Sequence, residues 1–196
     1  MSQGKVGSFS RNEERARVPG HGPIVLASTV KANNGIYLTG MLVTLLAAEL
    51  IPLVVASGEV IETGDGNTKA FTGTLAAFPV EPGTLAITDG IDTFTDDGCG
   101  RLTGSAGGTG TINYKTGAYS LTFNANVVLA TDVTADYVTA FDGVLDTQVD
   151  TTVEGSGIRV VHGTVDRTVL KIGKTDPVEP SAAVLAIVQA HGVYPI

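Results

Sequence analysis

A regular alternation of short apolar segments and turns, between about residues 57 and 140, constrains the fold of this chain most. Within the segments, apolar residues alternate with Thr, Ser and Asn, which is the two-residue period of a half-buried strand. Gly- and Asp-rich clusters such as Asp96-Asp97-Gly98 separate the segments. This spacing predicts a small antiparallel β-sandwich of immunoglobulin-like type, or a barrel. The expected strands are Ala70–Leu75, Thr84–Thr88, Asp92–Thr95, Thr109–Tyr114, Ala118–Phe123 and Val133–Thr139.

The segments on either side of this module have a different pattern of apolar residues. Ile24 to Val55 is rich in apolar residues, with a turn at Asn33-Asn34-Gly35, and Phe141 to Val149 resumes an apolar strand pattern after the module. An insertion of this kind is physically reasonable when both ends of the module lie close together at a loop tip. We therefore expect three parts: an extended N-terminal arm, a discontinuous core domain and an inserted β-sandwich domain. Their boundaries are residues 1–31 for the arm, 32–56 and 141–196 for the core, and 57–140 for the insert.

Two further elements are expected near the C-terminus. The stretch Gly157–Gly173 predicts a hairpin of two short strands, Ile158–Val161 and Thr168–Ile172, with Arg159 facing solvent. Ala182–Ala190 predicts a helix, because its apolar residues follow helical spacing between the start signal Pro180-Ser181 and the stop at Gly192. The fold class is therefore mainly β, with one C-terminal helix.

Charged residues are distributed unevenly along the chain. The net charge of −8 argues against a nucleic-acid-binding protein, which normally carries a basic face. Ten acidic residues lie in the module at residues 57–140, against Lys69, Arg101 and Lys115. The arm is net basic, since Lys5, Arg11, Arg15, Arg17 and Lys31 oppose only Glu13 and Glu14. Alone, such an arm is expected to be loosely extended, and to order against an acidic partner, for example by adding a strand to a sheet edge.

No membrane segment or leader is expected. Ile36–Ala56 is long enough to span a bilayer, but Gly40, Glu49 and Pro52 interrupt it and basic flanks are missing. The N-terminus lacks the apolar core of a signal peptide, so we expect synthesis and retention in the cytoplasm. A single cysteine, Cys99, excludes an intrachain disulfide.

Catalytic and cofactor sites are not expected either. His21, His162 and His191 lie far apart, each beside a glycine, and no pair has the spacing of metal ligands. We interpret His162 as a turn or packing residue. Cys99 lies in an acidic turn, which disfavours a thiolate nucleophile. The chain is therefore predicted to be no enzyme and to carry no cofactor or metal.

One cation site remains as an alternative. Asp89, Asp92, Asp96 and Asp97 alternate with other residues in a way that can ligate calcium, but their spacing does not match an EF-hand loop. Aspartate as a turn former beside glycine is the favoured interpretation. The Gly-rich run Gly104–Gly110 lacks the Lys-Ser/Thr ending of a phosphate-binding loop and is interpreted as a flexible connection.

The order of the flanking segments carries a resemblance to a known family. It comprises Gly35–Val43 (GIYLTGMLV), Gly143–Leu145 (GVL), Val160–Val165 (VVHGTV), the segment VLKIG, an Ala-rich helix and His191–Ile196 (HGVYPI). In the order and composition of these segments, the chain resembles the lambda-type head decoration proteins of tailed bacteriophages, over roughly residues 24–56 and 141–196. The insert departs from that family's compact pattern, and its start, Gly64–Phe71, resembles small β-domains of phage structural proteins.

The resemblance implies a β-rich decoration-protein core that forms a homotrimeric knob at threefold positions of the outer capsid surface. The N-terminal arm would grip the shell, the major capsid protein would be the partner, and the insert would project outward. The expected localisation is the virion, after synthesis in the host cytoplasm. The contact residues expected are Arg11, Arg15, Arg17, Ile36, Leu38, Val160, His162 and Val165. The alternative is a virion-surface adhesin or carbohydrate-binding module that acts through the insert.

Overall fold

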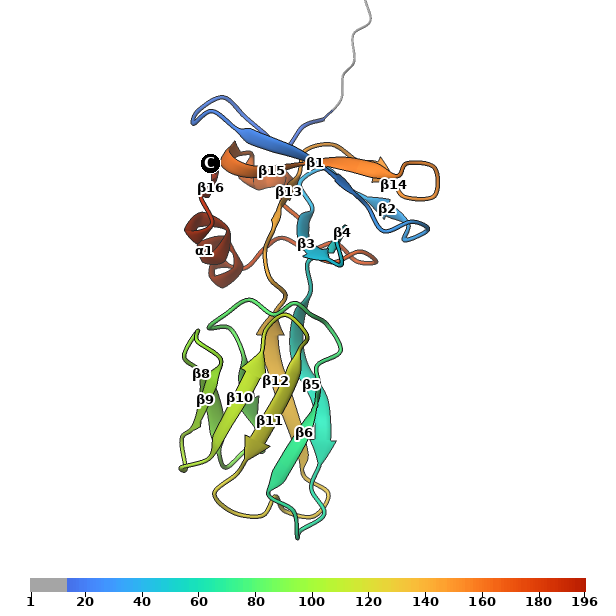
Figure 1. Ribbon diagram of the computed structural model, residues 1–196. Coiled ribbons are helices and arrows are strands. Elements are labelled where there is room, and N and C mark those ends of the chain that lie inside the picture. Colours follow the sequence, from blue (N-terminus) through green and yellow to red (C-terminus); the bar gives the residue numbers. More distant parts are fainter. Residues whose placement is uncertain (1–13) are drawn as a thin grey trace, which may run out of the picture.

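The chain forms two lobes, each built around its own β-sheet (Figure 1). The structure is a computed structural model and describes residues 14–196. We call residues 14–54 and 140–196 the base lobe and residues 55–139 the inserted lobe. The described chain is mainly β with a single α-helix near its C-terminus, which confirms the predicted fold class.

The base lobe contains a six-stranded sheet in the order β1-β15-β13-β3-β4, with β16 added in parallel to the end of β15. A two-stranded ribbon of β2 and β14 lies beside it, and Val30 forms a parallel bridge to Leu50 of β4, which draws the two sheet edges together. The strands are β1 (Ile24–Thr29), β2 (Ile36–Tyr37), β3 (Leu42–Leu46), β4 (Glu49–Pro52), β13 (Gly143–Leu145), β14 (Val149–Asp150), β15 (Ser156–Val165) and β16 (Val193–Pro195).

The predicted hairpin at Gly157–Gly173 is wrong. β15 runs straight through His162 and Gly163, and a short 3₁₀ turn, η1 (Arg167–Val169), follows it in place of a second strand. β15 stays extended because it has partners along its whole length: β1 and β13 at its start and β16 at its end. Arg159 is also not solvent-facing. It is 6% exposed, and its Nη2 lies 2.8 Å from Asp142 Oδ2.

Helix α1 (Ala182–Ala190) has the bounds that the sequence predicts. The Ser181 hydroxyl accepts a hydrogen bond from Val184 N at the N-terminus, and Gly192 takes φ +81° just after the C-terminus. The buried stripe of Val184, Leu185 and Val188 packs against the base sheet, where it joins a core with Leu42, Val144, Val160 and Val165. A second base-lobe cluster surrounds the fully buried Tyr37.

The inserted lobe is a single antiparallel sheet of eight strands in the order β5-β12-β7-β8-β9-β10-β11-β6. The two end strands, β5 and β6, come close to each other, so the sheet curls into a nearly closed barrel (Figure 1). The strands are β5 (Val55–Thr63), β6 (Ala70–Thr74), β7 (Ala86–Thr88), β8 (Thr93–Asp96), β9 (Arg101–Gly104), β10 (Thr109–Asn113), β11 (Ala118–Thr122) and β12 (Asp132–Val138).

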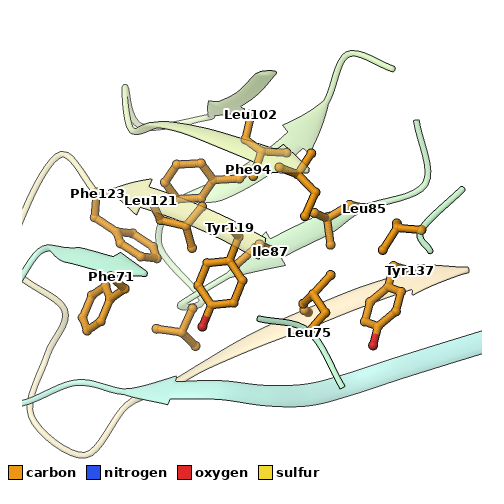
Figure 2. Packing of buried hydrophobic residues seen from close by; sticks show 14 of the residues in the cluster. Phe71, Leu75, Leu85, Ile87, Phe94, Leu102, Tyr119, Leu121, Phe123 and Tyr137 are labelled. Carbon is orange, nitrogen blue, oxygen red and sulfur yellow. The ribbon is translucent and has the colours of Figure 1, made fainter. Parts of the chain in front are cut away.

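The core of this barrel follows directly from the two-residue period of its strands. In β11 the buried residues Tyr119 and Leu121 alternate with exposed ones, and β12 buries Val133, Ala135 and Tyr137 in the same way. Figure 2 shows Tyr119 and Leu121 among the aromatic rings of Phe71, Phe94 and Phe123, while Tyr137 lies at the other end of the core beyond Leu75 and Leu85. Phe94 and Phe123 pack edge to face with ring centroids 4.8 Å apart. The inserted lobe therefore has a hydrophobic core of its own.

The chain enters and leaves the inserted lobe at one place. Val55 at the start of β5 pairs with Val138 at the end of β12, and Thr139 N donates to Val54 O at 2.9 Å. The Thr139 hydroxyl lies 2.8 Å from that of Thr44 in β3, which ties this crossing to the base sheet. The lobe is thus inserted into the base lobe with its two ends side by side.

The apolar stretch Ile36–Ala56 forms β2, β3, β4 and the start of β5, so its hydrophobic residues belong to sheets. Across residues 14–196, no helix has the length and apolar character needed to cross a membrane.

The part of the predicted arm that the structure describes, residues 14–31, lies against its own base lobe. Ala16 is fully buried, Arg17 forms a bridge to Val165, and Ile24–Thr29 forms β1. The arm does add a strand to a sheet edge, as expected of a partner contact, but the edge is that of β15 in the same chain.

Candidate interaction surface of the base lobe

We call residues 14–23, which precede β1, the leading segment. Its two arginines are held by one buried carboxylate. Asp146, which follows β13, is fully buried. Its Oδ2 lies 3.0 Å from Arg15 Nη1 and 3.3 Å from Arg17 Nε, and its Oδ1 accepts a hydrogen bond from Arg17 N at 3.3 Å. A buried carboxylate is stable only when its charge is compensated, so these two arginines have a structural role in their own chain. Arg11, the third expected contact residue of the arm, lies outside the described residues.

The expected apolar contact residues divide by exposure. Ile36 in β2 is 49% exposed, whereas Leu38 is half-buried. Val160 and Val165 in β15 are fully buried in the core beneath α1, so their side chains offer no surface to a partner. Of these four residues, only Ile36 presents a large apolar side chain to solvent.

An apolar edge of the base sheet was not among the expected contact residues. β1 is the first strand in the sheet order and pairs only with β15 along Ile24–Thr29. Its sequence, IVLAST, has no charged residue and no proline, and Ile24 and Leu26 are 54% and 46% exposed. An edge strand of this kind is a template for pairing with another chain, because nothing in its sequence discourages association. Tyr194 of β16 and the C-terminal Ile196 are also exposed in the base lobe.

His162 lies beside this edge. Its Nε2 is 2.9 Å from Nε2 of His21, which comes from the leading segment, and the ring of Tyr194 packs edge-on against both imidazoles. His162 is opposite Ile24 of β1 in the sheet register. The structure therefore brings together two histidines that the sequence separates widely.

The third histidine joins the two lobes. His191 at the end of α1 places Nε2 2.8 Å from Oε1 of Glu81 in the inserted lobe, and its ring packs edge-on against Phe141. The other carboxylate oxygen of Glu81 accepts a hydrogen bond from Phe141 N at 3.0 Å. Glu81 is 9% exposed while the His191 side chain is 42% exposed, so this contact lies at the partly open junction between the lobes.

The acidic turns of the inserted lobe bind their own backbone. Asp89 accepts hydrogen bonds from Ile91 N and Asp92 N, Asp96 from Gly83 N and Gly98 N, and Asp97 from Cys99 N and Arg101 N. The fourth, Asp92, is 3% exposed and accepts from Ala106 N and Gly108 N. Among residues 14–196, no three or more His, Cys, Asp and Glu side chains gather as metal ligands would.

The Gly-rich run Gly104–Gly110 is therefore an ordered turn and not a flexible connection. A Cβ atom at Gly104 or Gly108 would lie 2.5 Å from a carboxylate oxygen of Asp92. The glycines leave room for this carboxylate to reach the N–H groups of the β9–β10 turn.

One hollow of the base lobe is lined by residues of the leading segment, β1, the segment Thr147–Val149 and the start of β15. Its volume is about 600 Å³, and it is broadly open to solvent. Its lining includes Thr39, Gln148, Glu154 and Ser156, beside Ala27 and Ile158. These side chains form no nucleophile–base pair in the hydrogen bonds and ion pairs of the described residues.

No protein-family model, curated protein or solved structure matches the chain.

Proposed function

We propose that this chain is a capsid decoration protein of a tailed bacteriophage, which binds the outer surface of an assembled head and stabilises it. In this proposal it acts without catalysis, its partners are the major capsid protein and other copies of itself in a homotrimer, and its location is the virion. The protein binds the assembled lattice and not the free capsid subunits, so its binding free energy stabilises the assembled form by mass action.

The exposed edge of β1, which meets β4 through the Val30–Leu50 bridge just beyond the strand's end, is the observation that carries the proposal. It offers main-chain hydrogen-bonding groups and the exposed side chains of Ile24 and Leu26 without any charge. The leading segment and β1 lie on the side of the base lobe away from the inserted lobe (Figure 1). This arrangement suits a protein whose base lobe contacts a shell while the other lobe projects outward.

The alternative of a carbohydrate-binding adhesin has less support. Sugar-binding surfaces of small β-domains commonly use exposed aromatic rings, which combine an apolar face with a polar edge. The structure describes every residue of the inserted lobe, and its aromatic side chains are all buried or half-buried. A glycan array that bound residues 55–139 would favour the adhesin.

The proposal is tested by mixing the purified protein with expanded capsids that lack decoration. We expect saturable binding and added cryo-EM density at the threefold positions. Leu26→Lys should weaken binding tenfold or more, because it places a charge on the proposed contact. Val60→Lys is the matched control, since Val60 is equally exposed but lies in β5 of the inserted lobe.

Two outcomes would contradict the proposal: capsids that acquire no added density at saturating protein, and a Leu26→Lys variant that binds as tightly as the Val60→Lys variant. Light scattering coupled to size exclusion tests the homotrimer separately, because a protein that is a monomer in solution and trimeric only on the shell still satisfies the capsid-binding test.

A further inference from the structure

The pair His21–His162 has the geometry of two metal ligands. The two Nε2 atoms lie 2.9 Å apart, and the ring planes are inclined at 75°. Two nitrogen donors about 2.1 Å from one metal ion, at a right angle, lie about 3.0 Å apart, whereas a tetrahedral arrangement separates them by about 3.4 Å. The observed separation fits the right-angled arrangement that Cu²⁺ and Ni²⁺ adopt with nitrogen ligands.

Backbone contacts place the main chain of His21 next to β15. Thr164 Oγ1 donates to Val18 O or His21 O, at 3.1 and 3.3 Å, and Thr164 N donates to His21 O at 3.4 Å. These hydrogen bonds fix the leading segment against β15 at the position of His21. Main-chain packing therefore brings the two histidine positions within reach of one ion.

Two glycines make the close approach possible. Gly163 has φ +115°, and a Cβ atom there would lie 2.7 Å from Cα of Pro23. Gly192 has φ +81°, and a Cβ atom there would lie 2.5 Å from Nδ1 of His162. Side chains at these positions would push the leading segment and the His162 ring out of the observed arrangement.

We propose that His21 and His162 form a binding site for a divalent transition metal ion of the Cu²⁺ or Ni²⁺ type, with solvent water completing the coordination. Imidazole nitrogen is a preferred donor for these ions, and their affinity for such sites exceeds that of Mn²⁺ or Fe²⁺. A bound ion would fasten the leading segment to β15 and so stabilise the folded base lobe. The simpler interpretation of the same contact is one N–H···N hydrogen bond between two neutral imidazoles.

The test uses the full chain without a polyhistidine tag, freed of metal by a chelator and titrated with Ni²⁺ by calorimetry at neutral pH. We expect one saturable equivalent and a higher unfolding temperature in the presence of Ni²⁺. His21→Gln and His162→Gln should each weaken binding tenfold or more. His191→Gln is the matched control, because His191 pairs with Glu81 and should leave binding unchanged.

A second measurement needs no variant. In the wild-type protein, paramagnetic Ni²⁺ should broaden the ring resonances of His21 and His162 and leave those of His191 sharp. No saturable binding at millimolar Ni²⁺ would overturn the proposal and leave the hydrogen bond. Binding that is unchanged in both glutamine variants would overturn it too, since the ion would then sit elsewhere, for example at the chain's amino terminus.

Discussion

Single carboxylates organise the turns of the inserted lobe. Asp92 is the most buried of the four aspartates in its acidic turns, and it replaces water as the hydrogen-bond acceptor for Ala106 N and Gly108 N, at 2.8 and 3.0 Å. Those two N–H groups have no carbonyl partner in the β9–β10 turn, so their satisfaction depends on this one side chain. The carboxylate thereby links the β7–β8 turn to the β9–β10 turn.

Asp92→Ala should therefore destabilise the inserted lobe by about 2–3 kcal/mol, because it leaves two backbone donors without their acceptor, one of them the buried Gly108 N. Urea unfolding monitored by tyrosine fluorescence measures the effect. Asp132→Asn is the control: Asp132 is exposed and accepts only from the Thr63 hydroxyl among the residues described, so its loss should change stability by less than about 0.5 kcal/mol. Equal effects of the two substitutions would contradict this role of Asp92.

Aspartates in the turns of the inserted lobe also make the stability of the folded protein depend on pH. The pKa of Asp97 is lowered from its ordinary value of 3.8, first by the hydrogen bond from Cys99 N and then by that from Arg101 N. The pKa of Asp65 is lowered by Asn67 N and by the N–H and hydroxyl of Thr68. A carboxylate with a lowered pKa stabilises the folded state above its ordinary pKa, and this contribution is lost as pH falls through the lowered value.

We therefore expect the free energy of unfolding to decline as the pH falls below about 4, and Asp97→Asn to reduce the steepness of that decline. Chemical denaturation at a series of acidic pH values gives the slope directly. A decline of the same steepness in the wild type and in Asp97→Asn would show that the acid dependence arises elsewhere.

Contacts between residues that are far apart in the sequence could not be predicted. The favoured interpretation of the Asp-Gly clusters as turns needed only neighbouring residues, and it holds because Asp89 and Asp97 bond to N–H groups within four positions. Asp146 reaches Arg15 over 131 positions, and His21 reaches His162 over 141. Local sequence carries no signal for such contacts, because they depend on the register in which distant strands pair.

Among the elements, those with local start and stop signals were the ones that the sequence predicted best. Helix α1 has its predicted bounds because Ser181 and Gly192 act within one turn of its ends. β5 and β9 were not predicted, since Ser57 and Gly58 interrupt the apolar pattern of β5, and β9 (RLTG) has Leu102 as its single large apolar residue. The hairpin at Gly157–Gly173 failed for a different reason: His162-Gly163 has turn composition, but β16, which follows much later in the chain, pairs with it and keeps it extended.

The inserted lobe should fold as an independent unit. It has its own buried cluster of hydrophobic residues, and its two ends are already joined by the Val55–Val138 pair. A fragment of residues 54–140 is expected to unfold cooperatively, with the amide dispersion of a folded β-protein in its NMR spectrum. Leu121→Ala should destabilise both the fragment and the full chain, by about 2–5 kcal/mol, because Leu121 is 1% exposed in this core. A fragment without cooperative unfolding would show that the lobe needs the base.

At the scale of the whole molecule, the arrangement of the two lobes rests on few contacts beyond the two chain crossings. Glu81 binds both His191 and Phe141 N from the base lobe, and the rings of His191 and Phe141 pack with centroids 5.5 Å apart. Thr139 adds its hydrogen bonds to Val54 and Thr44 at the crossing itself. The Glu81–His191 contact is therefore the principal polar restraint between elements that are not adjacent in the chain.

His191→Ala removes this restraint at a side chain that is 42% exposed and that meets the base-lobe core only through the edge of Phe141. In the wild type, residual dipolar couplings from both lobes should fit one alignment tensor, as expected of two bodies that tumble together. In His191→Ala the two lobes should require separate tensors, while the couplings within each lobe still fit its own structure. Gln189→Ala, an exposed substitution on the same helix, should behave as the wild type. A single tensor in His191→Ala would mean that the crossings alone hold the lobes, and that Glu81 serves only to bind Phe141 N.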